Sequence, residues 1–436
     1  MSLKISVIGT GYLGATHAAC MANMGFETIG FDNDLSKIKI LETGAIPFYE
    51  PGLAELLSTE VKSGRLKFGT DISAVKDCDV HFLCVGTPQK NNSLAADLSF
   101  VEAAVSAIAP HLKPGSLLVG KSTVPVGTAQ MLREKLANLA PQAELAWNPE
   151  FLREGFAVED TLHPNRLVVG VTSDRAENIL REVYQKNLSE NTPWIRADLP
   201  TAELVKVAAN SFLATKISFI NAMAEVCEAA GGDVKVLADA IGYDPRIGNR
   251  FLQAGIGFGG GCLPKDIRAF MSRVEELGAS QALEFLSDID SINLRARQRL
   301  IDVVRSEFTT DLKSLRIAVL GAAFKPDSDD VRDSPALDIS LQLFEAGAQV
   351  TVHDPKAIEN ARARFPKLNY ESNLEKCVTG ANLILHLTEW REYREMDPAK
   401  LGTLVADKNL IDGRNMLDRE KYRANGWHFH ALGRSN

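Results

Sequence analysis

Cysteine and histidine are scarce in this chain, and neither is arranged in a familiar motif. The six cysteines among 436 residues form no Cys-x-x-Cys pair, which favours reduced thiols over a disulfide scaffold. The eight histidines form no HExxH motif and no cluster with cysteine, so the sequence gives no support for a metal site. The remaining composition, 45% hydrophobic and 24% charged, is typical of a globular protein.

Long apolar runs and basic runs are also missing. No stretch of 18 residues is free of charge, so we expect no membrane span. The net charge of -8, without a basic run, argues against nucleic-acid binding. An apolar strand and a glycine turn stand where a secretory signal would begin, so we expect a cytoplasmic protein. The length predicts two or three domains.

The N-terminal segment carries a dinucleotide-binding pattern. A strand at residues 5–8 leads into Gly9-Thr10-Gly11-Tyr12-Leu13-Gly14, a helix is predicted over 15–24, and a strand at 28–31 ends at Asp32. The three glycines serve the turn, the approach of the pyrophosphate, and the packing of helix on strand. Asp32 would bind ribose hydroxyls and repel a 2′-phosphate, so the pattern favours NAD over NADP.

Further strands are predicted at residues 80–85, 117–120 and 167–171. Gly86-Thr87-Pro88 follows the first of them, and Ser122-Thr123-Val124-Pro125 follows the second. Ligands of doubly wound sheets bind beyond the carboxyl ends of the strands, so both loops are expected to line the cofactor crevice. An ordinary turn is the alternative for residues 86–88.

Residues 201–230 are predicted to form one long helix, with Thr201 as its cap and Gly231-Gly232 at its end. Its apolar residues cover more than one face, which predicts burial between domains or subunits. Lys206 and Asn210 are four residues apart and share a face. They are site candidates, although a lone lysine on a helix is more often solvated.

From about residue 313 the chain repeats the α/β pattern, with strands predicted at 315–321, 350–354, 383–387 and 409–412. The turn after the first of these strands lacks the GxGxxG pattern, so this unit keeps the architecture without the dinucleotide. Lys325 and Arg332 offer cations to a phosphorylated ligand. A solvated polar loop is the alternative for this segment.

Residues 257–266 place Cys262 between a glycine run and an amphipathic helix that Pro264 would begin. A helix N-terminus and the neighbouring Lys265 both favour a thiolate. The alternative is a glycine-rich turn with a bystander cysteine.

An NAD site together with an activated cysteine suits aldehyde oxidation through a thioester. The loop at 147–155 offers carboxylates to activate water, or forms a salt-bridged turn.

Six motifs occur in order along the chain: Gly9-x-Gly11-x-x-Gly14, STVPVGT at 122–128, NPEFLREG at 148–155, Lys206-x-x-x-Asn210, GFGGGCLPKD at 257–266 and FKPDSDDVRDSP at 324–335. This set resembles the nucleotide-sugar dehydrogenases, the UDP-glucose/GDP-mannose dehydrogenase family, from the first strand to Arg414. The resemblance implies an α/β fold of two doubly wound, Rossmann-like domains joined by a long central helix and a small helical domain. The implied domains are an NAD-binding domain at 1–200, a helical dimerisation domain at 201–305 and a UDP-sugar-binding domain at 306–436.

The resemblance also implies catalytic roles. Cys262 is similar to the nucleophile, and Glu150 to the carboxylate that activates a water held by Thr123. Lys206 and Asn210 match groups that stabilise an oxyanion, with Lys206 also available for proton transfer. Asp266 matches the acid that acts with a water near the reacting carbon.

Binding roles follow from the same comparison of motifs and from the loops described above. The cofactor-binding candidates are Gly9, Gly11, Tyr12, Leu13, Gly14, Asp32, Lys37, Gly86, Thr87, Pro88, Ser122, Thr123, Glu154, Lys265 and Arg332. The substrate-binding candidates are Glu150, Phe151, Leu152, Arg153, Glu154, Lys206, Asn210, Arg246, Phe251, Leu252, Gln253, Ala254, Gly255, Gly259, Lys325 and Arg414.

The activity implied by the family is a four-electron oxidation of the C6 alcohol of UDP-glucose to the acid with two NAD, in a homodimer built on the central helix. Arg246 would reach the neighbouring subunit. GDP-mannose is the alternative substrate, and a catalytically silent nucleotide-sugar-binding protein is the remote alternative. The departures are small: Leu13 replaces a frequent valine, and Gly261 stands where many members have serine.

Overall fold

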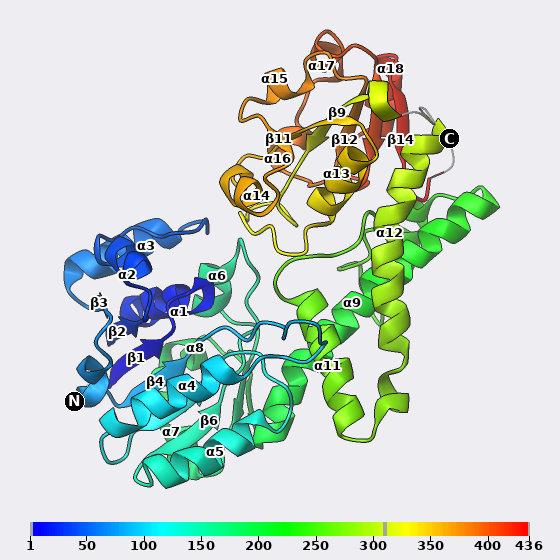
Figure 1. The fold of residues 1–436 in the computed structure, drawn as a ribbon. Coiled ribbons are helices and arrows are strands. Elements are labelled where there is room, and N and C mark those ends of the chain that lie inside the picture. Colours follow the sequence, from blue (N-terminus) through cyan, green and yellow to red (C-terminus); the bar gives the residue numbers. More distant parts are fainter. Residues whose placement is uncertain (1–2, 308–311, 435–436) are drawn as a thin grey trace. The chain divides into compact units, whose positions relative to one another are not determined.

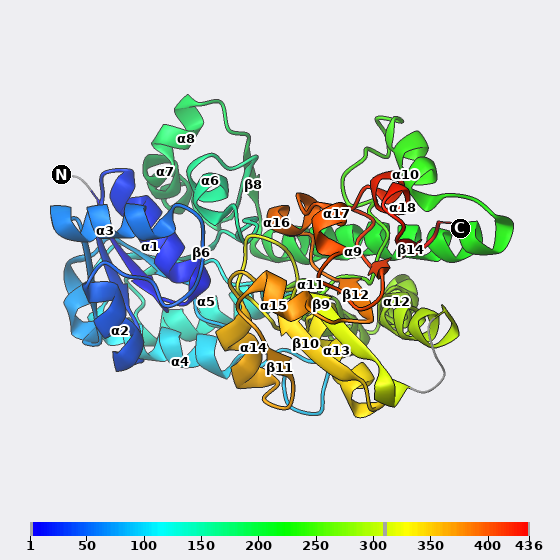
Figure 2. The same ribbon diagram turned by 90° about the horizontal axis from the view of Figure 1, so that it is seen from above.

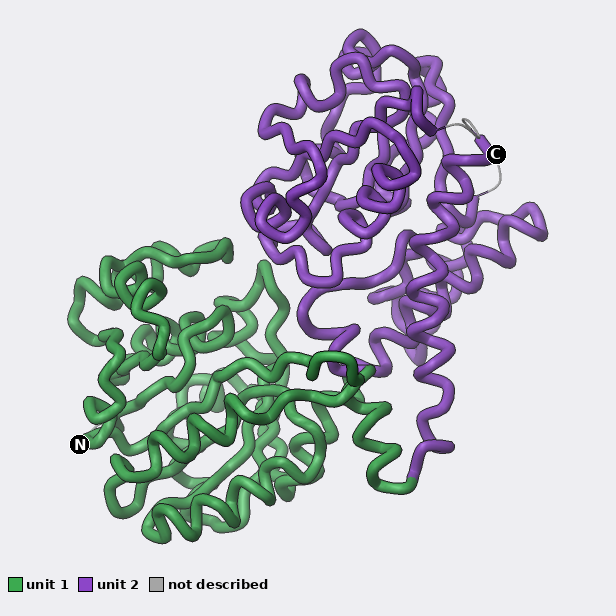
Figure 3. Tube along the Cα trace, viewed as in Figure 1, with its two compact units in different colours: residues 1–209, 268–278 green, residues 210–267, 279–436 purple. Residues whose placement is uncertain are grey.

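The computed structural model describes residues 3–307 and 312–434 of the chain (Figure 1). Its longest helix, α9 (Leu199–Ala230), is unbroken in both ribbon views (Figures 1 and 2). The chain divides into two compact units, residues 1–209 with 268–278 and residues 210–267 with 279–436 (Figure 3). The division falls within α9 and within α11 (Leu263–Glu276). The three-domain division at residues 200 and 305 stays a prediction.

The first unit is built on an eight-stranded sheet with the order β3-β2-β1-β4-β5-β6-β7-β8. Neighbouring strands are parallel, except that β6 and β7 share one antiparallel bridge, Trp147 to Gly170. The strands are β1 (Lys4–Ile8), β2 (Glu27–Phe31), β3 (Leu66–Gly69), β4 (Val80–Leu83), β5 (Leu117–Gly120), β6 (Glu144–Trp147), β7 (Leu167–Gly170) and β8 (Trp194–Ala197).

Helices cover both faces of this sheet, because successive side chains of a strand point to opposite sides. In β5, Leu117 and Val119 belong to the buried cluster that contains residues of α1 and α3, whereas Leu118 belongs to the cluster that contains residues of α4 and α5. The helices before α9 are α1 (Tyr12–Asn23), α2 (Leu35–Glu42), α3 (Leu53–Ser63), α4 (Ser99–Ile108), α5 (Thr128–Leu139), α6 (Ala157–Leu162), α7 (Asp174–Val183) and α8 (Gln185–Ser189).

The second unit contains a six-stranded parallel sheet with the order β11-β10-β9-β12-β13-β14. Its strands are β9 (Arg316–Leu320), β10 (Gln349–His353), β11 (Asn369–Tyr370), β12 (Leu383–His386), β13 (Asn409–Asp412) and β14 (His428–Ala431). The helices outside α9 and α11 are α10 (Val234–Gly242), α12 (Phe285–Glu307), α13 (Pro335–Glu345), α14 (Ile358–Arg364), α15 (Leu374–Val378), α16 (Arg391–Arg394), α17 (Pro398–Leu401) and α18 (Arg419–Ala424).

The two sheets share a central arrangement, since β1 lies between β2 and β4 and β9 lies between β10 and β12. This confirms the predicted repeat of two doubly wound α/β units. The predicted strands are present with ends that shift by at most two residues, whereas β3, β6, β8, β11 and β14 were not predicted. Within residues 3–307 and 312–434, no helix has the length and apolar character that a membrane span requires.

Three helix ends differ from the sequence prediction. Helix α1 begins at Tyr12, inside the glycine pattern, and α9 begins at Leu199. Thr201 is therefore not the cap of α9; its N–H instead donates to the Asp198 carboxylate at 2.7 Å. Pro264 is the second residue of α11 rather than the first, which still leaves Cys262 immediately before the helix.

Candidate active site

The glycine turn after β1 fits a dinucleotide phosphate. Gly9 has φ +89°, where a side chain would be strained. A Cβ at Gly14 would overlap the carbonyl oxygen of Gly9, whereas a Cβ at Gly11 would enter open space. Gly11 therefore leaves room beside the N-terminus of α1, where backbone N–H groups and the helix dipole favour an anion. These features match the pyrophosphate of NAD.

Asp32 lies at the end of β2 and is held in its charged form. Its carboxylate accepts hydrogen bonds from Thr10 N at 2.8 Å, Asp34 N at 3.0 Å and Lys37 Nζ at 2.8 Å. Burial alone would raise the pKa of Asp32, but these bonds outweigh burial and hold the pKa below its usual value. Lys37, expected at the cofactor, forms an ion pair with this acid.

The loops that follow β4 and β5 are joined by side-chain hydrogen bonds. Thr87 Oγ1 donates to the carbonyl of Thr123 at 2.8 Å, and Ser122 Oγ donates to the carbonyl of Val85 at 2.7 Å. The two loops thus lie together at the carboxyl edge of the first sheet. That they line the cofactor crevice, with Gly86 and Pro88, stays a prediction.

Glu150 and Lys206 form the most buried ion pair at the predicted site of the first unit. Glu150 Oε1 lies 2.9 Å from Lys206 Nζ, and the two side chains are 12% and 7% exposed. Glu150 Oε2 also accepts from Leu152 N at 2.7 Å, so the turn after β6 aims the carboxylate at α9. The motifs identified both residues, but their spacing of 56 positions gave no sign that they pair.

Two buried acids that support this region were missed from the sequence. Glu50, 3% exposed, accepts from the N–H groups of Gly155 and Ala157, both at 2.7 Å, and from the hydroxyl of Tyr12. It therefore ties the glycine turn to the loop that carries Glu150. Burial, followed by the contact with Glu50, raises the pKa of Tyr12. A lone acid before Pro51-Gly52 carries no signal of this role.

Glu203 is the second of these acids and lies one turn before Lys206 on α9. Its carboxylate accepts from Gly127 N at 2.8 Å and Ala129 N at 2.6 Å, at the start of α5. Burial raises the pKa of Glu203 to about 7 despite these bonds. Glu203 thus fixes the end of the 122–128 loop to the helix that presents Lys206.

Arg153 and Glu154 complete the 148–155 motif. The guanidinium of Arg153 forms two hydrogen bonds with the Asp160 carboxylate, at 2.9 and 2.7 Å, and remains half exposed. Phe151 lies under the guanidinium of Arg166 and near the ammonium of Lys206. The roles predicted for these motif residues in substrate binding stay predictions.

In the second unit, Cys262 is an exposed thiol directly before α11, and the other five cysteines are buried. Asp266 is 3% exposed and binds two predicted site residues. Its Oδ2 accepts from Asn210 Nδ2 at 2.7 Å, and its Oδ1 pairs with Lys265 Nζ at 2.6 Å. The start of α11 thus gathers four residues that the motifs proposed. No group of three or more metal-ligating side chains occurs in the described parts of the chain.

The glycine run before Cys262 is shaped by close backbone approaches. Asn293, fully buried on α12, holds both the N–H and the carbonyl of Phe258, at 2.7 and 3.0 Å. A Cβ at Gly259 would overlap the carbonyl of Asp333, and a Cβ at Gly261 would overlap the guanidinium of Arg332. The glycine at 261 therefore lets Arg332 cover the backbone next to Cys262, where a serine would need that guanidinium to move.

Arg414 fixes the predicted sugar-nucleotide loops of the second unit. Its guanidinium donates to the carbonyls of Leu387, Gly257 and Phe324 at 2.8 to 3.1 Å. The loop at 251–255 lies against the same segment, since Ile256 N donates to the carbonyl of Gly413 at 3.0 Å. Lys325 follows Phe324, so these candidates are neighbours; Arg246 instead is exposed and pairs with Asp244.

Comparison with known proteins gives this arrangement a family. The models for the UDP-glucose/GDP-mannose dehydrogenase family match in order: the NAD binding domain at residues 3–188, the central domain at 200–295 and the UDP binding domain at 318–419. The UDP-glucose 6-dehydrogenase TuaD of Bacillus subtilis is 41% identical over 99% of this chain and 93% of its own. The UDP-glucose 6-dehydrogenase of Rhizobium meliloti is 38% identical over 99% of this chain and all of its own.

A solved structure agrees with this assignment. The UDP-glucose dehydrogenase of Pyrobaculum islandicum superimposes with a TM-score of 0.91 at 35% identity, covering all of this chain and 98% of its own. The chain therefore belongs to the UDP-glucose/GDP-mannose dehydrogenase family and is an NAD-dependent oxidoreductase that carries the family's UDP binding domain.

Proposed function

We propose that the chain oxidises the C6 alcohol of UDP-glucose to the carboxylate of UDP-glucuronate by way of a thioester on Cys262. The observation that carries the proposal is the exposed Cys262 at the start of α11, next to the Asn210–Asp266 pair. The choice of UDP-glucose is supported by the relatives named for that activity, at 41% and 38% identity over nearly the whole chain.

The first oxidation converts the alcohol to an aldehyde. The hydroxyl loses its proton, with Asp266 and a water, or Lys206, as the acceptor, and the C6 carbon gives up a hydride. When bound, NAD accepts the hydride in this oxidation and a second NAD does so in the next, which accounts for four electrons. Lys206 and the amide of Asn210 stabilise the negative charge that develops on the oxygen.

The second oxidation and the hydrolysis use the thiol. The thiolate of Cys262 adds to the aldehyde to form a C–S bond, and loss of a second hydride leaves a thioester. Glu150 takes a proton from a water held by Thr123, and that water attacks the thioester carbon. The C–S bond then breaks, the thiolate of Cys262 returns, and the acid leaves. The buried Glu150–Lys206 pair supports this assignment, because it keeps an ammonium beside the carboxylate that would act as the base.

The remaining candidates are assigned to binding. The cofactor set centres on Gly11 and Asp32, and the substrate set on the 251–255 loop, Lys325 and Arg414. We also propose a cytoplasmic homodimer formed through α9. Phe212, Phe219 and Val226 on that helix are exposed in the single chain, and burying them against a second copy would remove apolar surface from water. Arg246, which is also exposed, would then reach the neighbouring subunit.

The decisive experiment measures NADH released per sugar consumed, with UDP-glucose, UDP-galactose, UDP-N-acetylmannosamine and GDP-mannose as substrates. Two NADH per UDP-glucose are expected, with UDP-glucuronate as product. One NADH with accumulating aldehyde would contradict the thioester route, and preference for GDP-mannose would transfer the proposal to that sugar. Binding of UDP-glucose without NADH from any sugar would point to a silent nucleotide-sugar-binding protein.

A further inference from the structure

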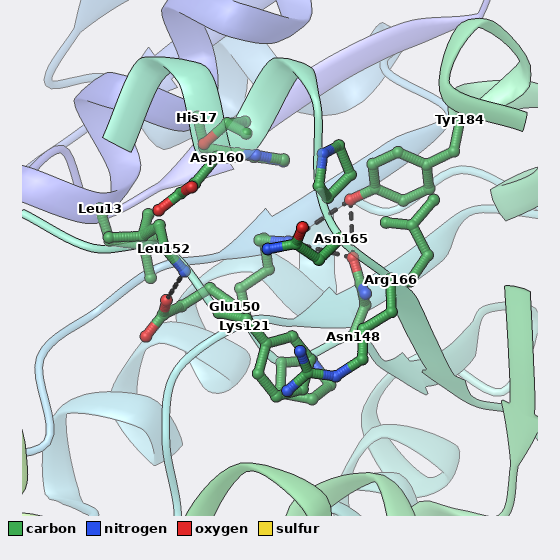
Figure 4. A pocket seen from close by; sticks show the side chains of 15 residues that line it. Leu13, His17, Lys121, Asn148, Glu150, Leu152, Asp160, Asn165, Arg166 and Tyr184 are labelled. Carbon is green, nitrogen blue, oxygen red and sulfur yellow. Dashed lines mark hydrogen bonds between the residues drawn. The ribbon is translucent and has the colours of Figure 1, made fainter. Parts of the chain in front are cut away.

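Lys121, which no motif singled out, is buried behind Glu150. It follows β5 directly, and its side chain is 7% exposed. It lines a cavity of about 50 Å³ in the first unit. Figure 4 shows this cavity, whose lining includes His17, Lys121, Asn148, Glu150 and Tyr184.

The ammonium of Lys121 holds the residue that starts the Glu150 loop. Lys121 Nζ donates to Asn148 Oδ1 at 3.0 Å and to the hydroxyl oxygen of Tyr184 at 3.4 Å. The Tyr184 hydroxyl donates to the same Asn148 oxygen at 2.6 Å, and Asn148 Nδ2 donates to the carbonyl of Val168 at 2.9 Å. The Asn148 side chain is therefore fixed at both ends, two residues before Glu150.

Glu150 is the acid whose negative charge acts on Lys121, because the other acidic groups close to Lys121 are neutral. Burial raises the pKa of Cys84 to about 12 and raises the pKa of Tyr184, so both stay neutral. Burial and the charge of Lys121 keep the pKa of His17 well below its usual value, so His17 is neutral as well. Among the described residues no carboxylate lies within ion-pair distance of Lys121, and Lys206 is the second cation that acts on it.

A buried ammonium without a direct counter-ion costs folding free energy. Burial lowers the pKa of Lys121 to about 8, which expresses this cost, and the charge of Glu150 offsets part of it. A methionine of similar length would pack in the same place without the charge. Residues that are costly to the fold and lie beside reacting groups are candidates for a functional role.

We propose that Lys121 is a positioning residue for hydrolysis of the thioester, acting through Asn148 and through its charge behind Glu150. The cluster of Glu150, Lys206 and Lys121 carries two positive charges and one negative charge. The excess positive charge favours the anion that forms when water adds to the thioester. The inference rests on the role of Glu150 in the proposed function, and it places Lys121 in the last step rather than in either oxidation.

The test compares Lys121→Met with the wild type and with Lys135→Met. Lys135 is a partly exposed lysine of α5 in the same unit that contacts Glu102, so its replacement controls for loss of one lysine. In Lys121→Met, we expect a rapid burst of two NADH per site and then a steady-state kcat about 10- to 100-fold below wild type. The KM values for UDP-glucose and NAD should fall together with kcat, so that kcat/KM stays within about twofold of wild type, because hydrolysis follows both oxidations. Mass spectrometry of the quenched protein should find a UDP-sugar thioester on Cys262.

A second variant guards against misfolding of the first. Tyr184→Phe removes one hydroxyl donor to Asn148 and keeps the ring, so it should slow hydrolysis about threefold, as expected for one hydrogen bond. An unchanged kcat in Lys121→Met, or a burst slowed as much as the steady state, would overturn the inference. If the wild type itself releases no NADH from any sugar nucleotide, the proposed function fails. This outcome is distinct from failure of the inference, which only the variants can show.

Discussion

The two sheets end their second strands with an acid, but the two acids are used differently. Asp32 after β2 shares its carboxylate between backbone N–H groups and the partly exposed ammonium of Lys37. Asp354 after β10 is 3% exposed, and its carboxylate accepts hydrogen bonds from N–H groups of the second unit. Those donors are Ala322 N, Ala323 N, Lys356 N, Ala357 N and Trp390 Nε1, at 2.7 to 3.1 Å.

The turn after β1 and the turn after β9 also differ in how much room they leave for a ligand. Gly321 has φ +116° and keeps the conformation of Gly9, but Ala323 replaces the open position of Gly11. Hydrogen bonds from Ser334 and Thr388 close this turn, and α13 begins only at Pro335. The N-cap of α13, Ser334, therefore lies at this turn, but the turn does not run directly into its helix as the glycine turn of the first sheet runs into α1. The same architecture binds a dinucleotide only where the turn leaves the backbone and the acid available.

The largest expected effect separates covalent chemistry from binding. Cys262→Ser should lower steady-state NADH release by at least about a thousandfold, because a hydroxyl is a far weaker nucleophile than a thiolate. UDP-glucose affinity, measured by calorimetry, should change little, since the 251–255 loop and Arg414 are untouched. Turnover at the wild-type rate in this variant would remove Cys262 from the mechanism.

A matched pair of substitutions tests the two turns. In Gly11→Ala the new Cβ meets no protein atom, so the fold should be unchanged, but it should obstruct the pyrophosphate. We expect NAD to bind about 30-fold more weakly, corresponding to about 2 kcal/mol of overpacking. Ala323→Gly in the second unit should leave NAD affinity as it is. Equal effects of the two variants on NAD titrations would show that the turns do not differ in this way.

The two acids can be exchanged for asparagine. Asp32→Asn should reduce the preference for NAD over NADP about tenfold, because the repulsion of a 2′-phosphate is lost and Lys37 loses its ion-pair partner. Asp354→Asn should leave this preference unchanged and lower the melting temperature by several degrees, because a buried acceptor of five N–H groups is lost. Cofactor kinetics and calorimetry decide between the two; unchanged selectivity in the first variant would contradict the ribose role of Asp32.

The smallest expected effect concerns Glu203, a buried acid of the first unit that also accepts backbone N–H groups. Its pKa of about 7 in the folded chain lies above the ordinary value of 4.5. Protonation of Glu203 therefore favours the folded state at low pH, and this contribution is lost as the pH rises through 7. Between pH 5 and pH 8 the melting temperature of Glu203→Gln should rise by about 2–4 °C relative to wild type. A constant difference between the two proteins would place the pKa near its ordinary value.

Much of the fold followed from periodicity, and part of the site followed from local motifs. The strands with continuous apolar runs, such as residues 117–120, were predicted with their correct ends. Short, partly exposed strands such as β8 and β11 have no such run and were not predicted. The glycine turn and the place of Cys262 before a helix depend on neighbouring residues, and both are present as predicted.

The sequence by itself determined the two α/β units, the glycine turn that suits NAD and the position of Cys262 before a helix, because each depends on residues within about one element of one another. Only the tertiary structure decided which groups support them. Glu50 reaches Gly155 across 105 residues, and Lys121 reaches Asn148 across 27. Such pairs are set by how strands and helices pack, and the identity of one partner contains no information about the other.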